Sequence, residues 1–281
     1  MERSSQKTYH TILEQEITEG LRELRRPVAG LLISGLSAGL DISFSLFLIA
    51  VMMTLLRGQV SHPLQEMLSA AMYSIGFILV VLGRSELFTE HTTRAVYPVL
   101  HGRASLAHLL RLWAVIYISN LVGSAAFAKL AAVVGPALGV IEPAVLGDIA
   151  RRVVDHPGWV IFLSALLAGW LMGLLSWLVS AARDTTSQVL LVGIITWSIG
   201  FARLHHTVVG SVEVLAGVFA RQGVGLGDYG HFLLWTTFGN AVGGAVFVAL
   251  FKYGHVIHGG ADPETVKLEE PSSILIDPSQ S

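Results

Sequence analysis

The sequence predicts an all-α integral membrane protein, with six transmembrane helices arranged as two inverted three-helix repeats. Its composition is 53% hydrophobic and only 14% charged, whereas soluble domains carry about 25% charged residues. Apolar segments long enough to cross a bilayer recur along the chain. Polar residues interrupt the second and the fifth of these segments, which predicts two broken helices.

The apolar segments follow one another with short polar connections in each half. The second is interrupted from Gly83 to Arg94 and resumes through Ala95 to Leu100. A stretch rich in glycine, proline and charge, about 135–157, is predicted to be a loop between the two halves. The six segments expected are about 28–56, 64–100, 106–134, 159–181, 189–218 and 232–251.

The two ends are predicted to lie outside the membrane domain, which we place at 27–256. Residues 1–26 are polar and lack the apolar core of a signal peptide, and Ile17, Leu21 and Leu24 have the spacing of an amphipathic surface helix. Residues 257–281 are expected to form a disordered tail. Arginine and lysine flanking the segments favour both termini in the cytoplasm of a bacterial-type inner membrane. The net charge of −2, without a basic stripe, argues against a nucleic-acid partner.

Short motifs repeat between the halves in matching order. Ser119-Asn120 with Gly123 matches Gly239-Asn240 with Gly243, and Ser34-Gly35 matches Ser164-Ala165. Since three segments per half is an odd number, the second half enters the membrane from the opposite side. Inverted repeats place their binding site near the midplane, at the ends of discontinuous helices. The asparagines themselves are expected to serve close helix packing.

The fifth segment breaks at a polar knot, Arg203–Thr207. The apolar run before it, 189–202, would span about 20 Å as a helix, but a bilayer core is about 30 Å thick. The knot therefore lies at membrane depth, where an ionisable group is a functional-site hypothesis. We place His206 at the centre of a pore. The alternative is a core histidine that satisfies its hydrogen bonds and pins the break.

Each helix that resumes after a break presents free backbone N–H groups and a positive dipole end. Two such ends form a cradle that suits a small anion. Thr89 and Thr207 are placed to cap these helices or to donate hydroxyls into the gap. Because histidine exchanges a proton near neutral pH, His206 is a candidate proton donor to a weak-acid anion.

Charged and bulky residues beside the breaks have two interpretations each. Arg84 and Arg203 either draw anions to the pore or form structural ion pairs with Glu86, Glu90 or Glu213, and we favour the ion pairs. Apolar bulk beside a break is either packing or a constriction that gates by excluding water. The residues concerned are Tyr73, Phe77, Leu87 and Phe88.

Three features together resemble the formate/nitrite transporter family: Glu86-Leu87-Phe88-Thr89 after a glycine, the run His206–Ser211, and the paired Asn-x-x-Gly segments. The resemblance covers about Pro27 to His255 and looks closest to a less characterised branch. It implies an aquaporin-like six-helix protomer, assembled as a homopentamer with one pore in each subunit. It also implies conduction of small monovalent anions such as formate, nitrite or hydrosulfide, often with protons.

The resemblance also assigns roles to single residues. It puts the family's central histidine at His206, its loop threonine at Thr89, and its hydrophobic slit at Leu87 and Phe88. Further slit positions fall on Tyr73, Phe77, Met172 and Ile199. Departures from the family pattern are Gly169 and Gly210, where members often have asparagine, an approximate basic counterpart at Arg152, and Arg203 close to the central histidine. These departures bear on the substrate more than on the fold.

The function predicted is a channel or transporter for small weak-acid anions, coupled to protons through His206, with no cofactor. A pore for small neutral solutes would share the architecture, although neither break contains Asn-Pro-Ala. A membrane enzyme with a metal held by His91, His205 and His206 is a third reading. The sequence has no His-Glu-x-x-His spacing, so neither an enzyme nor a metal site is expected.

Overall fold

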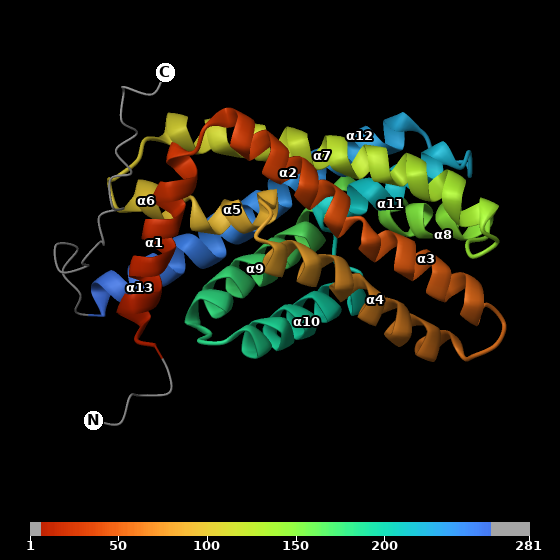
Figure 1. The fold of residues 1–281 in the computed structure, drawn as a ribbon, viewed down its shortest axis with the longest axis horizontal. Helices are drawn as coiled ribbons and strands as arrows, with labels where there is room; N and C mark the ends of the chain where they lie inside the picture. Colours follow the sequence, from red (N-terminus) through yellow and green to blue (C-terminus); the bar gives the residue numbers. More distant parts are fainter. Residues whose placement is uncertain (1–6, 260–281) are drawn as a thin grey trace, which may run out of the picture.

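The computed structural model describes residues 7–259 as a bundle of helices in which α5 and α11 are enclosed by longer ones (Figure 1). The helices in chain order are α1 Tyr9–Arg25, α2 Val28–Ile42, α3 Phe44–Leu56, α4 His62–Gly83, α5 Phe88–Arg94, α6 Tyr97–Leu100, α7 Leu106–Ala137, α8 Pro143–Val154, α9 Gly158–Ala181, α10 Thr185–Phe201, α11 Thr207–Phe219, α12 Leu226–Val242, the π-helix η1 Gly243–Leu250 and α13 Phe251–His258.

Five helical stretches within the described residues are long and apolar enough to cross a membrane. They are Val28–Leu56, His62–Gly83, Leu106–Ala137, Gly158–Ala181 and Leu226–His258. The first joins α2 and α3 across a bend at Ser43, whose hydroxyl donates to the Gly39 carbonyl at 2.6 Å. Such a bond to the preceding turn competes with the helix's own ladder and bends it.

Both predicted helix breaks are present and end their first helix in the same way. Arg84 and Arg203 adopt left-handed backbone, with φ of 54° and 52°. The next amide in each case turns back to a carbonyl five residues earlier, from Ser85 to Val80 at 3.1 Å and from Leu204 to Ile199 at 3.0 Å. This is the pattern of a Schellman cap. The first break is shorter than expected, because residues 88–94 already form α5.

One asparagine from each half ties a break to the helices around it. The Asn120 Oδ1 accepts from the Phe88 amide at 2.8 Å, and its Nδ2 donates to the carbonyls of Gly35 and Glu86. Asn120 is fully buried. Its side chain thus joins α2, α7 and the first break through three hydrogen bonds.

Asn240 makes the corresponding bonds at the second break. Its Oδ1 accepts from the Thr207 amide at 2.8 Å, and its Nδ2 donates to the carbonyls of Ala165 and His205. The serines that precede Gly35 and Ala165 also make equivalent bonds. The Ser34 hydroxyl accepts from the Glu86 amide, and the Ser164 hydroxyl accepts from the His205 amide. The paired motifs therefore make paired contacts, and each asparagine bonds backbone groups across a helix interface.

Two glycines allow the asparagine-bearing helices to approach this closely. A methyl group at Gly39 would collide with the carbonyl oxygen of Asn120, and one at Gly169 would collide with that of Asn240. Gly39 lies on α2 and Gly169 on α9. The missing side chains thus bring backbone to within contact, as small residues do at membrane helix crossings.

The connection between the halves is not the loop that the sequence predicts. Residues 143–154 form α8, whose Val145, Leu146 and Ile149 are buried and join the core with residues of α11. The expectation is wrong because the glycine and proline residues at 135–143 come before this helix and do not interrupt it. Pro143 stands in the first turn of α8, where no amide donor is needed.

The helix predicted near the N-terminus is confirmed as α1. Leu13 and Ile17 are fully buried in a cluster with Tyr97 of α6, Trp177 of α9 and Val256 of α13. Figure 1 shows α1 standing beside α13 and α6 at one end of the bundle. The tail expected from residue 257 lies, from residue 260 on, outside the described residues.

Candidate functional site

His206 lies in the interior, at the start of α11, with 1% of its surface exposed. Its Nδ1 accepts from the Val209 amide at 3.3 Å, so His206 caps this helix. Its Nε2 lies 2.8 Å from the Thr89 hydroxyl oxygen. Because Nδ1 accepts a hydrogen bond, a neutral ring carries its proton on Nε2 and donates it to Thr89. The two broken segments therefore meet through one imidazole.

Apolar side chains surround this contact. The Phe77 ring meets the His206 ring edge-on, with centroids 5.2 Å apart, and Tyr73 lies 5.3 Å from Phe77. Phe88 meets Tyr117 edge-on at 4.9 Å. All the expected slit residues, Tyr73, Phe77, Leu87, Phe88, Met172 and Ile199, belong to one buried core cluster. The expected slit residues thus share one core, and among them the Phe77 ring contacts His206 directly.

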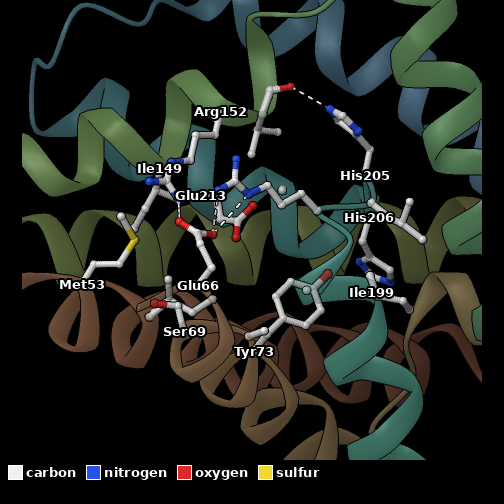
Figure 2. Close-up of a pocket in the computed structure, with 17 residues that line it drawn as sticks. Met53, Glu66, Ser69, Tyr73, Ile149, Arg152, Ile199, His205, His206 and Glu213 are labelled. Carbon is white, nitrogen blue, oxygen red and sulfur yellow. Dashed lines mark hydrogen bonds and ion pairs between the residues drawn. The ribbon is translucent and has the colours of Figure 1, made fainter. Parts of the chain in front are cut away.

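A cavity of about 90 Å³ reaches His206 from the side on which α4 begins. Figure 2 shows Tyr73 and Ile199 at its inner end near His206, and Glu66, Arg152 and Glu213 further out. We call it the Glu66 vestibule. Its lining comes from α3, α4, α8, the end of α10, residues 203–206 and α11.

Two arginines in the Glu66 vestibule share one carboxylate. Glu66 lies 2.9 Å from Arg152 and 2.8 Å from Arg203. Arg203 therefore forms a structural ion pair, as expected, but its partner is Glu66 and not Glu86, Glu90 or Glu213. Glu66 lies seven residues before Tyr73, on the same face of α4. Its two arginine partners are 86 and 137 residues away in sequence, so no local pattern predicts the interaction.

A second cavity, of about 490 Å³, opens at the other end of the bundle beside α1. Arg84 and Glu86 of the first break line it. Glu86 pairs with Arg26 at 2.6 Å and also contacts His91, so it does not pair with Arg84. Nearby on α1, burial and the adjacent Glu86 carboxylate raise the pKa of Glu23. We call this cavity the α1 vestibule.

The two cavities do not meet. Phe77, Leu87, Phe88 and Thr89 line neither of them, and the first three are at most 3% exposed. They lie with His206 between the inner ends of the two vestibules. Buried, mostly apolar side chains therefore separate the two cavities.

The backbone amides that open α5 and α11 are less free than the sequence suggests. The Phe88 and Thr207 amides are held by Asn120 and Asn240, and the Val209 amide by His206. The Thr207 hydroxyl also donates to Asn240, so it neither caps α11 nor points into the gap, whereas the Thr89 hydroxyl meets His206. Side chains of the protein therefore take three of the amides expected to form the cradle, and the positive dipole ends of both helices still face the site.

The three histidines considered for a metal are each engaged separately. His91 contacts Glu86, His205 lies between Ser164 and the Val153 carbonyl, and His206 meets Thr89. Within residues 7–259, no three potential metal ligands of the His, Cys, Asp and Glu types lie together. His205 is a structural residue of the second break.

Comparison with known proteins agrees with this geometry. The family model described as formate/nitrite transporter matches residues 10–254. The chain is 31% identical over 240 residues to the inner membrane protein YfdC of Escherichia coli, covering 85% of this chain and 76% of that one. It is 28% identical over 228 residues to the nitrite transporter NirC of Escherichia coli, with 79% and 81% covered.

Solved structures share the fold. An FNT family ion channel superposes with a TM-score of 0.77 at 23% identity, over 86% of this chain and 97% of that one. A pentameric formate channel with formate bound gives 0.67 at 23% identity, over 82% and 97%. With the family model spanning nearly the whole described chain, the protein belongs to the formate/nitrite transporter family of membrane transporters and channels.

Proposed function

We propose that the protein conducts small monovalent weak-acid anions, of the formate, nitrite and hydrosulfide kind, with a proton supplied at His206. The observation that carries the proposal is the buried His206–Thr89 contact, reached from one side by the Glu66 vestibule and separated from the α1 vestibule by buried apolar side chains. The names of its relatives, a nitrite transporter and a formate channel, support an anion of this class.

The apolar layer explains why a proton is needed. A bare anion between Phe77, Leu87 and Phe88 would lose its hydration without gaining enough donors. When His206 has taken up a second proton from water, it can pass its Nε2 proton to the anion, which leaves a neutral ring and gives a neutral acid that can pass an apolar constriction. Thr89 then positions the ring, because its hydroxyl oxygen accepts the bond that fixes which nitrogen holds the proton.

The paired contacts of Asn120 and Asn240 support a six-span, aquaporin-like protomer built from two inverted repeats. In this arrangement α4 with α5 and α10 with α11 are the broken second and fifth spans. A pentamer with one pore in each subunit follows from the relative described as a pentameric formate channel. With both termini in the cytoplasm, the α1 vestibule faces inward and the Glu66 vestibule faces outward.

Flux into liposomes containing the purified protein tests the proposal. Formate, nitrite, hydrosulfide and glycerol are presented across pH 5–8. We expect saturable anion movement that weakens sharply in His206→Ala, with glycerol excluded. Glycerol movement without anion movement would identify a neutral-solute pore instead.

A further inference from the structure

We propose that Glu213 sets the charge selectivity of the Glu66 vestibule, which admits anions when this carboxyl is neutral and repels them when it is ionised. The inference rests on the proposed anion transport and names the residue that controls entry.

Glu213 lies on the route to His206. It is on α11, seven residues after His206, and both line the same cavity together with Gly210. Positions i, i+4 and i+7 share one face of a helix. Figure 2 shows the Glu213 carboxyl beside that of Glu66, in the outer part of the cavity. An anion on its way to His206 must pass it.

The Glu213 carboxyl has no donor of its own. Among residues 7–259, no hydrogen bond or ion pair within 4 Å holds it, and Arg152 is the cation whose field reaches it. Glu66 already takes both Arg152 and Arg203 as direct partners. An ionised Glu213 would therefore stand partly desolvated without a direct partner, an arrangement in which proton binding removes an uncompensated charge.

The charge of the vestibule depends on this one group. Arg152, Arg203 and Glu66 together leave one positive charge, because two cations share one carboxylate. A neutral Glu213 preserves that charge, and an ionised Glu213 cancels it. A cavity with low-dielectric walls concentrates ions of the sign opposite to its own, so the two states differ in the anions they attract.

The titratable groups near Glu213 come from α4, α8 and the second break, and those of α7 and α12 are engaged elsewhere. On α7 and α12, Lys129 lies over the Phe219 ring and Tyr229 bonds to Ser211. From α3 the cavity receives only Ile49 and Met53. The titratable and charged groups that line the cavity with Glu213 are Glu66 and Tyr73 of α4, Arg152 of α8, and Arg203, His205 and His206 of the second break.

The test is formate and nitrite flux in liposomes at pH 5–8, expressed at each pH as the ratio of Glu213→Gln to the unaltered protein. The ratio cancels the protonation of the substrate and of His206, which both proteins share. We expect a ratio near 1 in acid that rises towards pH 8, by up to about tenfold per pH unit where a single group titrates. Glu213→Asp should keep a ratio near 1, as should Glu142→Gln, whose carboxylate is exposed on Arg57.

A ratio that stays flat across pH, or one below 1 throughout, overturns the assignment of Glu213. Absence of anion flux in the unaltered protein would instead overturn the proposed function. An infrared carboxyl band that titrates in the unaltered protein and is missing in Glu213→Gln gives a second readout, independent of flux. If no such band is lost, Glu213 does not change protonation and the inference fails.

Discussion

The imidazole Nε2 of His206 lies 2.8 Å from the hydroxyl of Thr89, across 117 residues of sequence, and this bond joins the two broken helices. The ring is held at both nitrogens, since the Val209 amide occupies Nδ1. A histidine fixed in this way presents one exchangeable proton at one place. Rotation of the ring would sacrifice both bonds.

Thr89→Val should leave the His206 Nε2 proton without an acceptor. An unpartnered buried polar group costs about 1–3 kcal/mol, so we expect a lower thermal stability in detergent and a slower, less pH-sensitive anion flux. Thr89→Ser should retain both. Thr186→Val, at an exposed threonine of α10, is the matched control. Unchanged flux in Thr89→Val would show that the hydroxyl does not position the ring.

Asn240→Ala should destabilise the second break. The change leaves the Thr207 amide and the carbonyls of Ala165 and His205 without this partner, and three such groups imply a loss of about 3 kcal/mol or more. Thermal unfolding measures it. Gln65→Ala, which removes only a 3.5 Å contact, is the control, and an equal loss in both would contradict the assigned role.

Asn120→Ala should behave like Asn240→Ala, because it strips the Phe88 amide and two carbonyls in the same way. The comparison tests whether the halves are built alike. We expect losses of unfolding free energy within about 1 kcal/mol of each other, given similar burial. A stable Asn120→Ala beside an unstable Asn240→Ala would show that only one break depends on its asparagine.

Gly39→Ala and Gly169→Ala should force apart the helices that carry the asparagines. Each added methyl meets an asparagine carbonyl, and overpacking of this kind costs about 1–3 kcal/mol. Gly193→Ala is the matched control, since no atom within 4 Å would meet its methyl group; there the change should stabilise α10 by up to about 1 kcal/mol. Thermal unfolding of the three variants measures these differences in stability. Similar shifts of the unfolding temperature in all three would exclude a packing effect at Gly39 and Gly169.

Phe88→Ala should open the apolar layer. Phe88 is 3% exposed and packs on Tyr117 and Trp113, so its removal leaves a cavity beside the pathway, at a cost of about 3–5 kcal/mol. We expect faster leak of anions and loss of discrimination against glycerol. Phe238→Ala, at a residue 60% exposed, should change neither. Selectivity that survives Phe88→Ala would mean that this ring only fills the core.

The interrupted helices and the central histidine could be predicted because their signals are local. Polar residues within an apolar segment predict irregular backbone at membrane depth, which must be buried in the protein or line a cavity. Asn120 and Asn240 stand in motifs that repeat along the chain. The left-handed backbone at Arg84 and Arg203 could not be predicted, because glycine is the usual residue at this position of a helix cap.

Other features depend on contacts that the sequence does not display. Glu66 could not be predicted as a site residue, because its ion-pair partners Arg152 and Arg203 lie far from it in the chain. The sequence overstates the amide cradle at the helix starts, because side chains from α7 and α12 take the Phe88 and Thr207 amides. The helix α8 was not predicted because it is short and directly follows a stretch of glycine and proline.

The most direct test of the central claim uses the fact that the chain has no cysteine. Ser69→Cys places a thiol in the Glu66 vestibule and Ser85→Cys places one in the α1 vestibule, with Leu138→Cys as an exposed control outside both. A membrane-impermeant thiol reagent should block anion flux through each of the two vestibule variants from opposite faces of the membrane, and leave the control conducting. If both thiols are labelled and flux continues, anions do not pass between these cavities beside His206.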